Sequence, residues 1–177
     1  NRDRVVTSAW ELLQERPWAQ VTVADICSRA DVVPRTFYRY FPDKVEILFA
    51  DSERHEANLS ETLALCPFDP ADPNDHARKV GTTLCAAVEP YGRDGYRRRI
   101  ELISSDPDLT ARDQVKRQRM EAIVQEHFAG LVDDPVRAEV WASTVVSAFF
   151  AAMRSWAHGS GSLADHAKRA LDCVSLT

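Results

Sequence analysis

Residues 22–48 read TVADICSRADVVPRTFYRYFPDKVEIL, and this stretch predicts two short helices joined by a tight turn. Thr22 is suited to cap the first of them, because Asp25 stands three residues on, where a capping-box acid is found. Asp31 tolerates the left-handed backbone of a turn. Pro34 suits the first position of the next helix, which we expect at about residues 34–40. Two such helices packed on a preceding helix form a helix-turn-helix.

The second of these helices has two distinct faces. Phe37 and Phe41 are four residues apart and share one face, so we expect them to bury against Trp10, Leu13 and Ile26. The other face carries guanidinium and hydroxyl groups: Arg35, Thr36, Tyr38, Arg39 and Tyr40. Such groups are the donors that proteins use on DNA phosphates and base edges. The pattern therefore favours double-stranded DNA as a partner.

The stretch resembles the DNA-binding motif of the tetracycline-repressor (TetR) family of transcriptional regulators, most specifically in the string T-F-Y-R-Y-F-x-x-K. The resemblance implies an N-terminal three-helix head over residues 1–46. It also implies a helical effector-binding and dimerisation domain over residues 47–177. The DNA contacts that it implies are Thr22, Arg35, Thr36, Tyr38, Arg39, Tyr40 and Lys44.

Two positions depart from the family's pattern. Asp31 stands where a turn glycine is common, and its tolerance of left-handed geometry preserves the turn. Val33 stands where a serine or threonine usually caps the recognition helix. Losing that cap should cost on the order of 1 kcal/mol, partly offset by Pro34. It also removes one hydroxyl that could contact a phosphate.

Helical periodicity continues through the rest of the chain, with proline and glycine at the breaks. We expect helices at about 2–16, 22–30, 34–40, 43–65, 74–90, 95–104, 108–130, 135–158 and 162–175. The proline-laced loop at 67–73 is the clearest interruption. No alternating strand pattern of useful length is present, so the predicted fold class is all-α.

The segment 135–158 is apolar around roughly 200° of its circumference, where a surface helix shows little more than about 100°. One face can pack on its own domain, and the other is predicted to meet a second copy, with the last helix, in a four-helix interface. The predicted contacts are Trp141, Val145, Ala148, Ala152, Trp156, Leu163, Ala167, Ala170, Leu171 and Val174. The alternative is a monomer in which these helices form the deepest core.

The resemblance places a ligand pocket inside the C-terminal bundle. The candidate lining residues are Leu84, Cys85, Val88, Met120, Ile123, Val124, His127, Trp141 and Phe149. Aromatic and sulfur-containing side chains suit an apolar or planar small molecule, and His127 is the interior candidate for a polar anchor. The alternative is that each of them is ordinary core. The arginines 93, 97, 98 and 99 are interpreted as a solvated helix face, with an anion site at the pocket mouth as the alternative.

The net charge of −5 argues against indiscriminate nucleic-acid binding, but residues 29–44 hold four basic side chains against two acidic ones, a local balance of +2. The four cysteines and five histidines are dispersed, so we expect reduced thiols and no metal. No apolar run approaches the roughly 18 residues of a membrane span, and no signal peptide is evident. We therefore expect a cytoplasmic protein without a membrane partner.

These patterns predict a ligand-responsive transcriptional regulator, with no cofactor. The resemblance implies a repressor that binds a palindromic operator as a homodimer and is released by a small, largely apolar effector. The alternative is a helical interaction or ligand-sensing module without DNA affinity, which the near-neutral head and Val33 would suit. An enzyme is the least favoured class, because the chain shows no nucleophile elbow, phosphate-binding glycine loop or acid/base pair.

Overall fold

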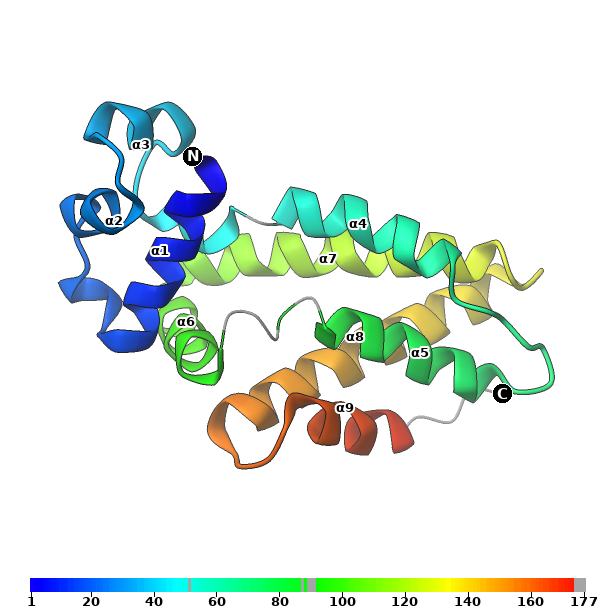
Figure 1. The fold of residues 1–177 in the computed structure, drawn as a ribbon. Helices are drawn as coiled ribbons and strands as arrows, with labels where there is room; N and C mark the ends of the chain where they lie inside the picture. The colour runs from blue at the N-terminus through cyan, green and yellow to red at the C-terminus, as the bar shows by residue number, and fades with distance from the viewer. Residues whose placement is uncertain (51, 87, 89–91, 174–177) are drawn as a thin grey trace. The chain divides into compact units, whose positions relative to one another are not determined.

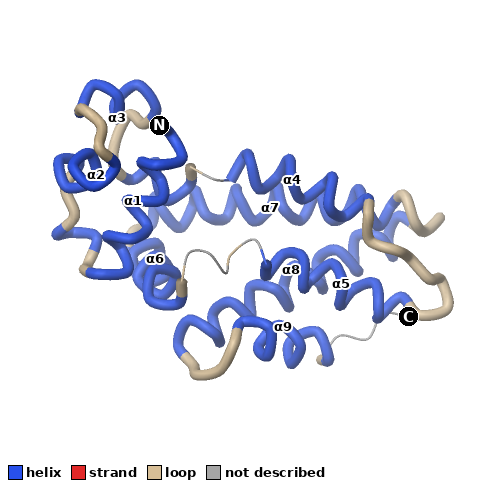
Figure 2. The backbone as a smooth tube through the Cα atoms, in the orientation of Figure 1, coloured by secondary structure: helices blue, strands red, loops and turns tan. Residues whose placement is uncertain are grey.

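A computed structural model describes residues 1–50, 52–86, 88 and 92–173 of the chain. In this part of the chain all regular structure is helical and no strand occurs, which confirms the predicted all-α class (Figures 1 and 2). The residues form two compact units. The first, called the head below, is Asn1–Glu53 with Tyr91–Asp113, and the second unit is Arg54–Pro90 with Gln114–Thr177.

The head contains the predicted helix-turn-helix. Its elements are α1 (Arg2–Glu15), η1 (Trp18–Gln20), α2 (Val23–Ala30), α3 (Pro34–Tyr40), η2 (Val45–Phe49), α6 (Arg93–Ser105) and the start of α7 (Pro107–Ala129). Thr22 and Asp25 form the predicted capping box at α2, and Asp31 has the left-handed backbone of the turn, with φ 51°. Pro34 occupies the first turn of α3. The structure therefore confirms the capping box, the turn and the helix start that the sequence predicted.

An apolar cluster holds these helices together. Phe37 and Phe41 are buried, with ring centroids 5.8 Å apart, and share the cluster with Trp10, Leu13 and Ile26. This confirms the predicted inner face of α3. Burial of two aromatic rings fixes the rotation of α3 about its axis, so Arg35, Tyr38 and Arg39 are exposed.

The sequence predicted that the arginines of α6 form a solvated face, and the structure contradicts this for Arg98 and Arg99. Arg98 donates to the Leu13 carbonyl (2.6 Å). Arg99 is buried and donates to the Leu48 carbonyl (3.2 Å) and to Asp113 (2.8 Å). Because these guanidinium groups bind within the head, the alternative of an anion site on this arginine run finds no support from them.

Helix α6 also approaches α1 closely. A Cβ atom on Gly95 would lie 2.9 Å from the Cγ of Gln14, so this contact requires the absence of a side chain. Arg97 pairs with Asp94 near the surface, at 2.8 Å. The head thus includes a helix that lies far beyond the helix-turn-helix in the sequence.

The single helix predicted over residues 43–65 was wrong, because the structure divides it into η2 and α4 (Ser52–Ala64). Asp43 caps the start of η2, accepting from the amides of Val45 (2.8 Å) and Glu46 (3.0 Å). At its end, the carbonyls of Leu48 and Ala50 accept from Arg99 and Arg2. These two bonds join the end of η2 to α6 and to α1 within the head.

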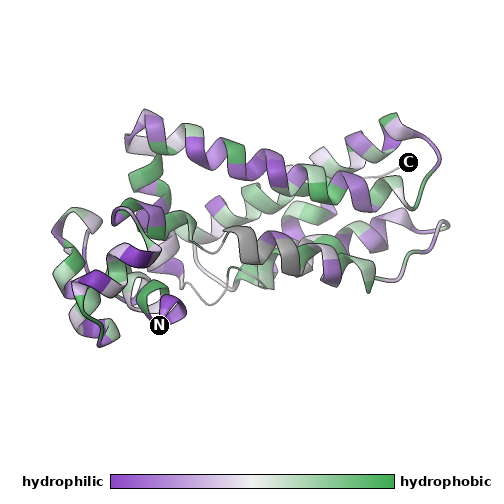
Figure 3. Cartoon of the chain, turned by 90° about the horizontal axis from the view of Figure 1, so that it is seen from above, coloured by the Kyte–Doolittle hydropathy of each residue, from purple (hydrophilic) through white to green (hydrophobic). Residues whose placement is uncertain are grey.

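The second unit is built from α4, α5 (Pro73–Ala86), the rest of α7, α8 (Pro135–His158) and α9 (Leu163–Asp172). The predicted bounds of α8 are confirmed. Helix α5 is described as far as Ala86, and residues 87, 89 and 90 of its predicted range lie outside the described residues. Helices α5 and α9 approach closely at Gly81, where a Cβ atom would lie 2.6 Å from Leu171 Cδ1. Hydrophobic and hydrophilic residues alternate around the helices, as amphipathic packing requires (Figure 3).

The turn between α8 and α9 is held by a buried histidine. One ring nitrogen of His166, Nδ1, lies 2.8 Å from the Ser155 hydroxyl and 2.8 Å from an Nη of Arg169, and the other, Nε2, lies 2.8 Å from the Ser160 carbonyl. Because a carbonyl only accepts and a guanidinium only donates, Nε2 carries the proton and Nδ1 accepts. The ring is therefore neutral in this arrangement.

In the described part of the chain, α8 is the one helix whose length and composition would allow it to cross a membrane. Half of its apolar window is buried inside the unit. A buried core helix of a soluble protein has the same length and composition, so this feature is weak evidence for a membrane span.

Candidate functional site

The outer face of α3 presents donors that the protein itself does not use. Tyr38 is 57% exposed and Arg35 is also exposed, while Thr36 is half-buried. Among the described residues, none of these three side chains has a hydrogen-bond or ion-pair partner. The Tyr38 ring packs edge-on against Phe37, with centroids 5.2 Å apart, which orients its hydroxyl. Three unused polar groups on one rigid helix are suited to bind an external partner.

Arg39 and Tyr40 bind one another. The Arg39 guanidinium donates to the Tyr40 hydroxyl (2.7 Å) and lies 4.7 Å from the centre of its ring. Tyr40 also packs against the apolar cluster of the head. This pair holds a cation near the end of α3, and the guanidinium keeps further N–H groups for a ligand.

The structure places Lys44 inside the framework of the head. Its ammonium group donates to the carbonyls of Trp18 and Val21, both at 2.7 Å, and lies 5.0 Å from the centre of the Trp18 ring. Burial lowers the pKa of Lys44. Two of its three N–H donors are therefore bonded to backbone carbonyls. The predicted contact of Lys44 with a DNA phosphate stays a prediction and would use the third N–H.

Thr22 is likewise engaged. Its hydroxyl donates to the Asp25 carboxylate (2.8 Å) and accepts from the Asp25 amide (3.1 Å). The Thr22 amide also donates to this carboxylate (2.8 Å), and the bonds from the Thr22 amide and hydroxyl hold the pKa of Asp25 below its ordinary value. A phosphate at this position would therefore meet backbone amides at the start of α2, and that role also stays a prediction.

The basic charge of the head is unevenly distributed. Arg29 donates to both carboxylate oxygens of Glu15, the longer contact being 2.9 Å, and Arg16 pairs with Asp25 at 3.0 Å. The bond from Arg29 lowers the pKa of Glu15. Arg35 and Arg39, by contrast, have no acidic partner in the described part of the chain. Two exposed arginines without an acidic partner thus lie on α3, although the chain is acidic as a whole.

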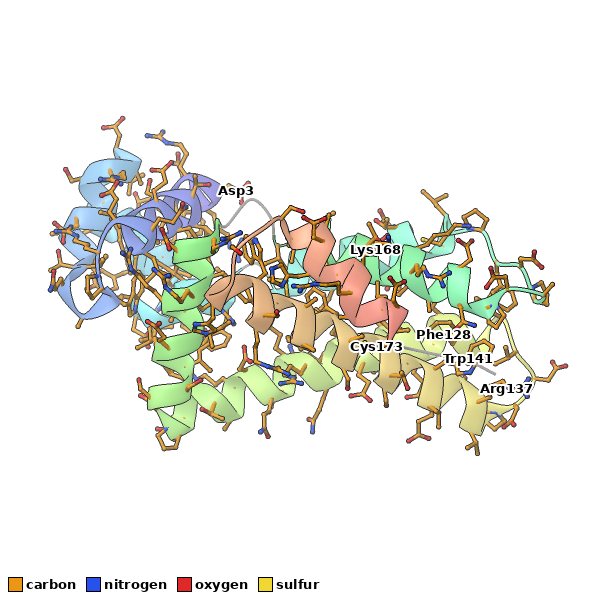
Figure 4. All side chains as sticks on the ribbon, turned by 90° about the horizontal axis from the view of Figure 1, so that it is seen from below. Asp3, Phe128, Arg137, Trp141, Lys168 and Cys173 are labelled. Carbon is orange, nitrogen blue, oxygen red and sulfur yellow. The ribbon has the colours of Figure 1, made fainter. Side chains whose placement is uncertain are left out.

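The candidate pocket residues of the second unit are mostly core. Five are buried (Leu84, Cys85, Val124, Trp141 and Phe149) and four are half-buried (Val88, Met120, Ile123 and His127). Phe128 and Trp141 meet edge to face at 5.6 Å, and Arg137 lies 5.9 Å from the Trp141 ring centre (Figure 4). Whether these residues contact an effector stays a prediction.

His127 has a partner that the sequence analysis missed. Its Nε2 atom lies 2.8 Å from Nε2 of His76, which is 1% exposed, and the two rings stack with centroids 5.0 Å apart. Nδ1 of His76 lies 2.9 Å from the Pro67 carbonyl. Burial, and then the nearness of His76, lower the pKa of His127. The spacing of His76 with Val80 and Leu84 along one helical face was the available signal.

The predicted dimer contacts pack inside the single chain. Eight of them are buried in it: Trp141, Val145, Ala148, Ala152, Trp156, Leu163, Ala167 and Leu171. Ala170 is half-buried, and Val174 lies outside the described residues. These buried side chains have little surface left to lose to a second copy. A contact through α8 and α9 must therefore use outward neighbours such as Val136 and Val140, which are 66% and 54% exposed.

Histidine, cysteine, aspartate and glutamate do not gather into a metal site in the described part of the chain. Within it, no three such residues are close enough together to hold an ion. Its free cysteines are Cys27, Cys66, Cys85 and Cys173.

Comparison with known proteins agrees with this geometry. The family model described as "Bacterial regulatory proteins, tetR family" matches residues 5–50, and the model described as "MftR C-terminal domain" matches residues 72–175. The HTH-type transcriptional regulator EthR of Mycobacterium tuberculosis is 35% identical over 68 residues, which cover 37% of this chain. The match spans about a third of EthR, 32% of its length.

Solved structures share the fold. A TetR-family regulator from Syntrophomonas wolfei has a TM-score of 0.75 at 17% identity, covering 97% of this chain and 91% of that one. FadR of Thermus thermophilus, a TetR-family repressor solved with lauroyl-CoA, has a TM-score of 0.60 at 21% identity, covering 97% and 92%.

The two family models together cover the helix-turn-helix and most of the second unit, from residue 72 onward. The first of these models and the EthR match both describe regulatory proteins. The chain therefore belongs to the tetR family of transcriptional regulators, with a DNA-binding helix-turn-helix and a C-terminal ligand-binding domain.

Proposed function

We propose that the chain is a cytoplasmic repressor that binds a palindromic operator as a homodimer and is released by a small, largely apolar effector. The observation that carries the DNA part is the outer face of α3, where Arg35, Thr36 and Tyr38 keep unused donors. The buried Phe37 and Phe41 hold that face in place. In this proposal residues 1–46 bind DNA and residues 47–177 provide effector binding and dimerisation.

A dimer is supported by the size of the reading element. Helix α3 has 7 residues and can reach only a few base edges. A twofold pair of heads would read two half-sites about one turn of DNA apart, roughly 34–36 Å, and would combine two weak contacts into a specific one. The exposed Val136 and Val140 on α8 supply apolar surface for a second copy.

An apolar effector is supported by the residues of the second unit. Its interior is rich in aromatic and aliphatic side chains, and the His76–His127 pair is a polar group among them. FadR of Thermus thermophilus, which shares the fold, was solved with lauroyl-CoA, a ligand with a long apolar chain. Release follows if the effector binds the conformation that is incompetent for DNA more tightly than the competent one.

The experiment that tests the proposal is selection of DNA from a random pool by the purified protein. The expected result is an enriched palindrome, bound by a dimer. Arg35→Ala and Tyr38→Ala should each weaken binding to that site about ten-fold or more while the protein stays folded. Arg119→Ala, an exposed arginine on α7, is the matched control and should bind as the wild type does.

A module without DNA affinity is the second candidate. It is favoured by Lys44 and Thr22, because both use their side chains inside the head. A folded dimer that enriches no site at low salt would support this candidate and contradict the repressor. Binding that falls steeply as salt rises would exclude it, because phosphate contacts release counterions.

A further inference from the structure

The residue before the recognition helix exposes an apolar side chain. Val33 is 63% exposed, whereas its neighbour Val32 packs against the apolar cluster of the head. The backbone of Val33 is extended (φ −82°, ψ 152°), and its side chain makes no capping bond. The isopropyl group therefore contributes little to the head's own core.

The start of α3 does not need a capping side chain at this position. Pro34 has no N–H group to satisfy, and the Thr36 amide donates to the Val33 carbonyl at 2.8 Å. The Phe37 amide reaches the same carbonyl at 3.4 Å. Because the backbone of Val33 supplies these bonds, its side chain is left free to contact a partner.

The position and the chemistry of the side chain indicate what that partner is. Residues at the N-terminal end of a recognition helix are the ones that reach base edges in the major groove. An isopropyl group neither donates nor accepts a hydrogen bond, so it gains nothing from a phosphate or from a polar base edge. The C5-methyl group of thymine is the one apolar feature of the major groove.

We propose that Val33 reads the C5-methyl group of a thymine in each operator half-site. The inference rests on the proposed function, because it requires that α3 enters the major groove. It adds a residue that determines base preference beside Arg35, Thr36 and Tyr38, which supply polar contacts.

The test is a double-mutant cycle on the operator obtained by selection. Each thymine of the half-site is replaced by deoxyuridine, symmetrically, which removes only the methyl group. At one thymine, wild-type affinity should fall about four-fold per half-site, the effect of one methyl group leaving an apolar contact. Val33→Ala should bind the thymine operator less tightly and should lose little more when that thymine is replaced.

Two further variants separate recognition from folding. Val33→Ser restores a capping hydroxyl, so the head should be at least as stable, yet it should lose the discrimination between thymine and deoxyuridine. Val115→Ala, on the exposed surface of α7, is the matched control and should keep the wild-type discrimination.

The outcomes are distinguishable. An enriched operator at which no deoxyuridine weakens wild-type binding, or at which the Val33→Ala and deoxyuridine effects are additive, overturns this inference alone. A folded dimer that enriches no operator overturns the proposed function, and this inference with it. Coupling between Val33 and one symmetric thymine supports both.

Discussion

In the head, the outward side chains of Arg35, Thr36 and Tyr38 have no partner among the described residues. In the second unit, by contrast, His76 and His166 are buried, and each bonds through both ring nitrogens. These three side chains of the head are therefore available to bind another molecule, whereas the two histidines stabilise the arrangement of their own helices.

This difference explains why the polar contacts of the head's α3 were easier to predict from the sequence than those of the second unit. The chemistry of the head follows from a short contiguous string, because one helix carries both the buried and the exposed residues. In the second unit, by contrast, the His76–His127 pair joins residues 51 positions apart in the sequence. Substitutions can test this contrast between side chains without a partner in the chain and side chains that are bonded or buried within it.

The largest effect is expected within α3 itself. Phe37→Ala removes a fully buried ring and should lower the free energy of unfolding of the head by about 3–5 kcal/mol. Tyr38→Ala, one residue on, should change it by no more than about 0.5 kcal/mol while weakening operator binding. Denaturant unfolding followed by circular dichroism measures the first effect, and DNA titration the second. Equal destabilisation by both changes would show that α3 does not have the described inner and outer faces.

The next largest effect is expected at the arginines of α6. Arg99→Ala removes a buried guanidinium and leaves Asp113 without its partner, so it should cost about 2–3 kcal/mol of unfolding free energy. Arg97→Ala, which breaks a surface pair with Asp94, is the control and should cost less than about 1 kcal/mol. The same denaturant measurement applies. Similar costs for the two variants would restore the interpretation of this run as a solvated face.

These arginines also show where sequence reasoning stops. The capping box at Thr22, the turn at Asp31 and the aromatic face of α3 were predicted because each depends on residues within one or two helical turns. The roles of Arg98 and Arg99 depend on carbonyls of Leu13 and Leu48, far away in the sequence. A run of arginines has the same local pattern whether it faces water or another helix.

The site itself was predicted to a similar extent. The sequence identified the polar residues of α3, but it did not distinguish them from Lys44, whose ammonium group is bonded to Trp18 and Val21. It also predicted that one apolar face of α8 meets a second copy; the α8 residues named for that contact are buried in the chain itself, and the contact stays a prediction. Periodicity shows that a face is apolar, but the number of elements in the same chain decides what covers it.

Lys44 provides a third, smaller test. Lys44→Met keeps the length of the side chain and removes both bonds to backbone carbonyls, so it should cost about 1–2 kcal/mol of stability. If Lys44 acts only in the framework, the dependence of operator affinity on salt should be unchanged at a temperature where the variant is folded. A salt slope reduced by about one per head would instead show that its third donor contacts a phosphate. Arg35→Ala is the positive control for such a reduction.

The smallest effect concerns the histidine pair of the second unit. The Pro67 carbonyl can only accept, so His76 carries its proton on Nδ1 and accepts at Nε2 from His127. Phe68 and Phe128 pack edge-on against the His76 ring, and Asp75, the acidic neighbour, is paired with Lys79. A second added proton would place two N–H groups against one another. The pair is therefore stable only while at least one ring is neutral.

The sign of the pH dependence follows from the lowered pKa of His127. Below the ordinary histidine value of about 6.5, the unfolded chain binds more protons than the folded one, so stability falls as pH falls through the lowered pKa. His127→Gln can still donate to His76 but does not titrate. The melting temperature of this variant should therefore fall less than that of the wild type between about pH 8 and about pH 5, roughly 1.5 units on either side of the ordinary histidine pKa. His158→Gln, on the exposed end of α8, should keep the wild-type slope. Identical slopes in all three proteins would mean that the buried pair is not titrating, and that its lowered pKa has no measurable effect on the stability of the second unit.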